Sequence, residues 1–147
     1  MADYTQRLVW LIRRAELATQ QARERVLQRH GITGAQHAAL TVIDLRDGIT
    51  SAELARQCFV TAQTMNGTVS RLAAAGLIER TAHHMHRKLI ELHLTTAGRE
   101  TFLRADAAMA AFDDELAAAL PAATLPAVKS ALVELAERAD TMSATPD

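Results

Sequence analysis

The segment from Thr61 to Leu94 changes its hydrophobic period once, and this change limits the possible folds more than any other feature of the sequence. In its first part, apolar residues recur at helical spacing, at Ala62, Met65, Val69 and Leu72. Gly76 follows and is typical of a helix end. The next residues include LIERTA and LIELHL, in which Ile90, Leu92 and Leu94 alternate as in a β-strand. A helix followed by a β-hairpin is therefore predicted.

Helical patterns account for most of the remaining chain. The expected helices are Asp3 to His30, ended by Gly31; a helix capped by Thr33 that stops near Gly48; a short helix of about Ser51 to Cys58; one of roughly 23 residues that Thr95 or Thr96 caps; and a last helix from Thr124 or Leu125 to about Ala139. Thr50 and Glu53 form a capping-box pattern before the short helix. In the last helix, Val128, Leu132 and Leu135 are expected to point inward. The fold class is mainly α with a small β-hairpin.

Composition narrows the function classes. The 147 residues suggest one domain, with a formal net charge of −1. Charge is unevenly distributed, since residues 61–94 carry a net +2 and residues 95–147 a net −5 before any histidine is charged. The sequence shows no signal peptide or membrane span, which predicts a cytoplasmic protein. It also shows no Gly-rich phosphate loop, nucleophile elbow or supported Ser-His-Asp grouping, so no enzyme is expected.

Two short helices followed by a hairpin with a basic tip indicate a winged helix-turn-helix that binds DNA. An α-helix fits the major groove, and short polar side chains near its N-terminus can reach base edges. The expected reading residues on the second helix are Thr61, Gln63, Thr64, Asn66, Gly67, Ser70 and Arg71, with Thr68 as a further hydroxyl donor. Arg71 is expected to contact the DNA backbone. The expected wing contacts are His84, His86, Arg87 and Lys88, whose charge would favour phosphate.

The sequence resembles the multiple-antibiotic-resistance regulator (MarR) family of bacterial transcription factors. The resemblance rests on GITGAQHAAL, ITSAELARQ, VTAQTMNGTVSRLAAAGLIER and LHLTTAGRE, which together cover about Gly31 to Glu100. It implies a DNA-binding region at 31–95, between dimerisation helices at 1–30 and 96–147. It also implies a homodimer on a palindromic duplex, acting as a repressor that a small aromatic or phenolic acid releases. Trp10, Arg14, His30 and His37 would then line the acid's pocket.

The sequence departs from the family pattern at two places. Family wings usually carry an Asp-x-Arg pair, whereas His86 and Lys88 occupy those positions here, with Arg87 between them. Lysine is a point donor rather than a planar fork. Gly67 stands where many members carry a basic residue, and it either permits close approach of the backbone to DNA or weakens the helix by up to about 1 kcal/mol.

Three other interpretations compete with this one. The first is a zinc site at His83, His84 and His86. A zinc-sensing regulator of the same fold could instead use Glu24, His30 and His37. We expect no metal or other cofactor, because structural zinc usually takes four ligands. The second is a redox role for Cys58, whose place before Phe59 and Val60 instead suggests a buried structural turn. The third is a helical protein-interaction dimer without DNA binding, which would leave the basic wing unexplained.

Overall fold

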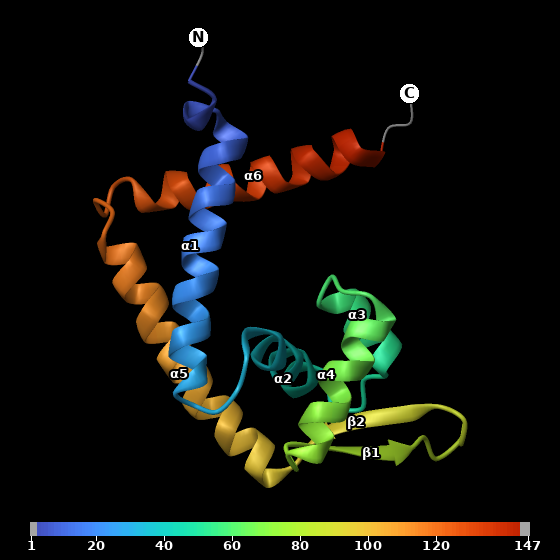
Figure 1. Ribbon diagram of the computed structural model, residues 1–147. Helices are drawn as coiled ribbons and strands as arrows, with labels where there is room; N and C mark the ends of the chain where they lie inside the picture. The colour runs from blue at the N-terminus through green and yellow to red at the C-terminus, as the bar shows by residue number, and fades with distance from the viewer. Residues whose placement is uncertain (1–2, 145–147) are drawn as a thin grey trace. The chain divides into compact units, whose positions relative to one another are not determined.

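The structure, a computed structural model, describes residues 3–144 and confirms a mainly helical fold with a single two-stranded hairpin (Figure 1). Its elements are the 3-10 turn Tyr4–Gln6, the helices α1 (Leu8–Gln28), α2 (Gly34–Leu45), α3 (Ser51–Gln57), α4 (Ala62–Ala74), α5 (Thr96–Ala118) and α6 (Leu125–Ala144), and the strands β1 (Ile78–Ala82) and β2 (Ile90–Leu94). The chain divides into two compact units, Met1–Met109 and Ala110–Asp147, and α5 continues from the first into the second.

Local capping explains where the helices begin. Thr33 caps α2 through a complete capping box, since its hydroxyl accepts from the Gln36 amide at 3.2 Å and the Gln36 side chain accepts from the Thr33 amide at 2.9 Å. Thr50 caps α3 by accepting from the Glu53 amide at 3.2 Å. The Glu53 carboxylate binds Arg56 and Gln57 within the same helix. Both predicted caps are therefore confirmed in position, but in the capping box predicted at Thr50 the Glu53 side chain binds Arg56 and Gln57 in place of the Thr50 amide.

Three expectations about the terminal helices are corrected. The first helix begins at Leu8 rather than Asp3, because the Asp3 carboxylate accepts from the Thr5 amide and stabilises a separate 3-10 turn. The last helix continues to Ala144, past the predicted end at Ala139. Leu132 does not point inward within the chain, since 55% of its surface is exposed.

The hydrophobic core of the first unit is assembled where α2, α3, α4 and β2 meet the C-terminal end of α1. Its largest fully buried side chains are Leu27, Leu40, Ile43, Leu54, Leu72 and Leu92. The first unit's part of α5 adds Phe102 and Ala105 to the same cluster. In contrast, no residue of α1 before Leu27 is buried, and neither is any described residue of the second unit.

The hairpin is attached to the helices at both strands. Its register pairs Ile78 with Leu94 and Arg80 with Leu92, and a further bridge joins Leu92 to Ile49 before α3. Thr95 then closes the base of the hairpin, because its amide donates to the Leu77 carbonyl at 3.1 Å and its hydroxyl donates to the Gly76 carbonyl at 2.6 Å. These contacts fix the start of α5 against the base of the wing.

Within residues 3–144, no helix is both long and apolar enough to cross a membrane.

We predict that Gly98→Ala destabilises the chain by about 3 kcal/mol, because overpacking against fixed backbone has no easy relief. Gly98 is buried near the start of α5, and an added Cβ would lie 1.8 Å from the Leu77 carbonyl oxygen. Chemical unfolding in urea measures the change. Gly67→Ala is the matched control, since a Cβ there meets only the Arg71 guanidinium at 3.6 Å and should stabilise α4 by up to about 1 kcal/mol. Equal stability of the two variants would contradict the assigned packing.

Candidate nucleic-acid interface

The rotation of α4 about its axis is set by three buried side chains. Met65, Val69 and Leu72 are each no more than 2% exposed and pack into the core. Thr61 caps the helix by accepting from the Thr64 amide at 3.1 Å. The side of α4 opposite the core is consequently free, and its N-terminus carries unpaired amides that favour an anion.

The predicted polar face of α4 is exposed. The exposed members are Thr61, Gln63, Thr64, Asn66, Ser70 and Arg71, with Gly67 half-buried among them. The expectation for Thr68 is wrong, since this residue is only 2% exposed and its hydroxyl donates to the Thr64 carbonyl at 3.3 Å. Thr68 lies beside Val69 on the core side of the helix, where the hydroxyl is satisfied by the preceding turn.

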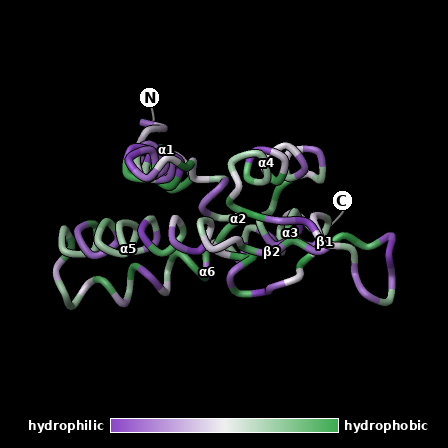
Figure 2. The backbone as a smooth tube through the Cα atoms, turned by 90° about the horizontal axis from the view of Figure 1, so that it is seen from below, coloured by the Kyte–Doolittle hydropathy of each residue, from purple (hydrophilic) through white to green (hydrophobic). Residues whose placement is uncertain are grey.

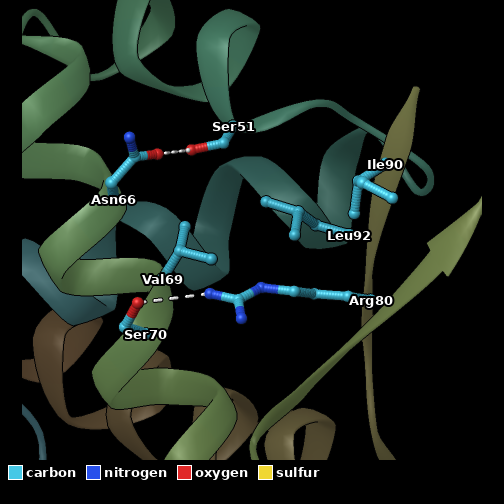
Figure 3. Close-up of a pocket in the computed structure, with 7 residues that line it drawn as sticks. All are labelled: Ser51, Asn66, Val69, Ser70, Arg80, Ile90 and Leu92. Atoms are coloured by element: carbon cyan, nitrogen blue, oxygen red, sulfur yellow. Dashed lines mark hydrogen bonds between the residues drawn. The ribbon is translucent and has the colours of Figure 1, made fainter. Parts of the chain in front are cut away.

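Two residues of this face are held by side chains from other elements. The Ser51 hydroxyl, at the start of α3, donates to the Asn66 side-chain oxygen at 2.7 Å. The Arg80 guanidinium reaches from β1 to the Ser70 hydroxyl at 3.3 Å. Both interactions are visible in Figure 3. The Asn66 amide nitrogen is thereby turned away from Ser51, and Asn66 is presented in a defined orientation.

A cavity lies between α4 and the hairpin and includes these two hydrogen bonds. Its volume is about 280 Å³, and it is lined by Ser51, Asn66, Val69, Ser70, Arg80, Ile90 and Leu92 (Figure 3). Val69, Ile90 and Leu92 give the cavity an apolar surface, and Arg80 adds one guanidinium. Sequence reasoning missed Ser51 and Arg80 as site residues. The alternation of β1 could have indicated Arg80, which occupies an inward register position opposite Leu92.

The wing ends in a loop whose residues are largely hydrophilic and which extends away from the helices (Figure 2). His84, His86, Arg87 and Lys88 are exposed there, as predicted for wing contacts. His83 instead supports the loop. Its Nδ1 accepts from the amides of Met85 and His86 at 3.1 and 3.2 Å, while its ring stacks on those of His84 and His86.

A second histidine joins the wing to the end of α2. His93 Nδ1 lies 2.8 Å from Asp47 Oδ1, and its Nε2 lies 2.9 Å from the Thr81 hydroxyl. Glu91 stands between the two supporting histidines, 3.5 Å from His83 and 3.6 Å from His93. Among residues 3–144, no three His, Cys, Asp or Glu side chains are arranged to hold a metal ion.

The four residues predicted to line an acid pocket do not lie together in the single chain. Trp10 and Arg14 line a cavity of about 200 Å³ on the N-terminal half of α1, together with Arg13 and Leu17. His30 follows the same helix 20 residues after Trp10, which is about 30 Å along the helix axis. His37 is on α2, where its ring centroid lies 6.0 Å from that of Phe102.

The surroundings of His37 also bear on the zinc-sensing alternative. Glu24 accepts from the Gly34 amide with both carboxylate oxygens at 3.0 Å, so its charge stabilises the N-terminus of α2. His37 Nε2 is buried, 3.5 Å from Asp106 Oδ1, a separation too long for a strong hydrogen bond. Arg23 Nε is likewise buried without a hydrogen-bond partner among the described residues.

The turn between α3 and α4 corrects one expectation and supports another. Cys58 is half-buried against the core, and burial raises the pKa of its thiol, which supports a structural role. Phe59, expected in a buried turn, is 96% exposed. Its φ of +56° makes it the one non-glycine residue with a positive φ among residues 3–144.

The fold and this surface define a winged helix-turn-helix protein. The MarR family profile matches residues 30–88. The chain is 35% identical over 92 residues to the HTH-type transcriptional repressor Rv2887 of Mycobacterium tuberculosis, a match that covers 63% of this chain and 66% of that protein. The aligned part thus spans just under two thirds of the curated relative.

Solved structures extend the match to nearly the whole chain. Rv2887 in complex with salicylic acid has 30% identity and a TM-score of 0.71, covering 88% of this chain and 96% of that chain. The transcriptional repressor CouR, bound to a 23-mer DNA duplex, has 26% identity and a TM-score of 0.85, covering 92% and 96%. The chain belongs to the MarR family of transcription regulators.

We predict that folding stability falls as the pH drops below about 6.5 and that His37→Gln removes part of this fall. Burial lowers the pKa of His37, while Asp106 opposes this effect. The unfolded chain therefore takes up a proton at this site at a higher pH than the folded chain, so the neutral-pH stability is lost on acidification. Urea unfolding between pH 7.5 and 5.5 measures the slope. The control is His84→Gln, an exposed histidine; an equal flattening in both variants would contradict the assignment.

Proposed function

We propose that the chain is a homodimeric repressor that binds a palindromic DNA duplex through the α4 face and the wing. In each protomer, Gln63, Thr64 and Asn66 contact bases in the major groove, while Arg71 contacts the backbone. His84, His86, Arg87 and Lys88 contact phosphates from the wing. A regulator of bacterial genes would act in the cytoplasm.

The single observation that carries this proposal is the exposed, polar and side-chain-supported face of α4 beside a basic wing. Asn66 is oriented by Ser51, and Ser70 is joined to Arg80, so the face is ordered before DNA arrives. An ordered reading surface loses less conformational entropy on binding than a mobile one. The repressor CouR, which shares the fold, was solved on a 23-mer duplex, and this supports the same mode of binding here.

Dimerisation is supported by large apolar side chains that are exposed in the single chain. On the N-terminal half of α1, Leu8, Val9 and Trp10 are 46–78% exposed. In the second unit, Leu116, Leu132 and Val133 are 46–57% exposed. Apolar surface of this extent favours association with a second copy.

Two alternatives stay without a supporting observation. A zinc-responsive regulator would need a ligand set, whereas Glu24 is engaged at the N-terminus of α2. A protein-interaction dimer without DNA binding leaves the basic wing and the ordered α4 face unexplained.

The first test compares a wing contact with a base contact. Arg87→Ala should weaken binding to all duplexes alike and reduce the steepness of the salt dependence, because it removes a phosphate contact. Asn66→Ala should instead relax discrimination at one base pair per half-site, by roughly 1–3 kcal/mol. Selection of bound duplexes from a random pool, followed by titration at several salt concentrations, measures both effects. Equal losses at every base position in both variants would refute the assigned roles.

We also propose that a small aromatic acid releases the repressor by occupying the cavity between α4 and the hairpin. Arg80 supplies a guanidinium for a carboxylate, and Val69, Ile90 and Leu92 supply an apolar surface for a ring. The cavity is also lined by Asn66 and Ser70, so an occupant would compete with DNA for the reading face. The solved complex of Rv2887 with salicylic acid supports this ligand class.

The second test uses salicylate and the DNA-free protein. Arg80→Met should weaken salicylate binding about tenfold, since it removes a charge-assisted hydrogen bond. Arg14→Met is the matched control and should bind normally. Isothermal titration calorimetry measures both. The opposite pattern, with loss only in Arg14→Met, would assign the acid to the first-helix cavity with Trp10.

A further inference from the structure

The turn between α3 and α4 carries an aromatic ring where a glycine would be expected. The Phe59 amide donates to the Arg56 carbonyl at 3.2 Å, and the Val60 amide donates to the Ala55 carbonyl at 3.1 Å. These two bonds define a Schellman motif at the end of α3, in which Phe59 occupies the left-handed position. Glycine is the usual residue there because a side chain crowds the backbone in this conformation.

The Phe59 ring itself is not packed against the part of the chain that the structure describes. With 96% of its surface exposed, the Phe59 ring buries almost no apolar area and so gains none of the free energy that burial supplies. The left-handed backbone at Phe59 is therefore a cost that burial of its ring does not offset within the described chain. Strained backbone positions of this kind are concentrated at functional sites, which is consistent with a role for Phe59 outside the chain.

The position of Phe59 beside the N-terminus of α4 favours DNA as the partner. Phe59 precedes Thr61, the cap of α4, by two residues, and Gln63 and Thr64 lie in the next helical turn. The ring therefore extends the exposed face of α4 past the helix N-terminus, the end that approaches base edges in a helix-turn-helix. An apolar side chain at this edge can contact the thymine methyl group and the faces of deoxyribose.

We propose that Phe59 is a DNA contact that favours thymine at one position per half-site. This inference rests on the proposed function. It adds an apolar contact to a surface whose other members are polar or cationic. Because the ring carries no charge, its contribution is independent of salt, in contrast to those of Arg71, Arg87 and Lys88.

The experiment compares full-length parent, Phe59→Gly, Phe59→Ala and Phe59→Tyr. Glycine removes the ring and relieves the strained φ, so this variant should be thermally more stable than the parent. Alanine removes the ring but keeps a Cβ at the strained position, and so separates loss of the ring from relief of strain. Both variants should bind the selected duplex roughly five- to tenfold more weakly with an unchanged salt slope. Tyrosine should retain the parent's affinity.

Random-pool selection gives the second readout. The parent's consensus should contain a thymine in each half-site that the Phe59→Gly variant selects no longer, while the remaining positions stay the same. If the parent binds DNA and Phe59→Gly binds equally tightly with an unaltered consensus, the inference is overturned and the ring belongs to a protein partner. If neither the parent nor any variant binds a duplex, the proposed function itself fails, and this inference fails with it.

Discussion

The packing of Met65, Val69 and Leu72 into the core is the constraint on which the remaining surface depends. These side chains fix the rotation of α4, and every polar residue on its opposite face takes its direction from that rotation. A turn of the helix by one residue, about 100°, would place Asn66 against the core and would move Leu72 to the exposed place of Arg71. The cost of burying an unpaired amide and exposing an aliphatic side chain opposes such a turn.

Contacts at the base of the hairpin fix the positions of the wing and of α5 relative to α4. Thr95 binds the carbonyls of Gly76 and Leu77, and Gly98 leaves room for the Leu77 carbonyl to lie against α5. The end of α4, the start of β1 and the start of α5 are thus joined by short backbone contacts. The junction is small and has few degrees of freedom, which is suited to holding a wing at a constant place beside a helix.

Much of this architecture could be predicted from the sequence, because it depends on local signals. The change of period after Gly76, the caps at Thr33 and Thr50, and the buried stripe on α4 each involve residues within a few positions of one another. The MarR resemblance and the exposure of the reading face followed from the same signals, and the comparisons with known proteins confirm the family. The DNA contacts themselves stay predictions.

What could not be predicted depends on residues that are distant in the chain or on backbone conformation. Ser51 meets Asn66 across 15 positions, and Arg80 reaches Ser70 only because the strand register turns it inward. Thr68 was misplaced because a hydroxyl was assumed to face solvent, although the preceding turn satisfies it. Phe59 was misplaced because hydrophobicity alone indicated burial, whereas the residue is exposed at the left-handed C-terminal cap of α3.

The hydrogen bond between Ser51 and Asn66 has a consequence for how such a surface can change during evolution. Because α3 orients the amide, a new preference for a base need not arise from a substitution on α4. Exchange of Ser51 for alanine would free the Asn66 side chain to adopt other rotamers without altering any residue that faces the groove. On the proposed assignment of Asn66 to a base contact, selectivity is adjustable from a neighbouring helix, with the residues of α4 unchanged.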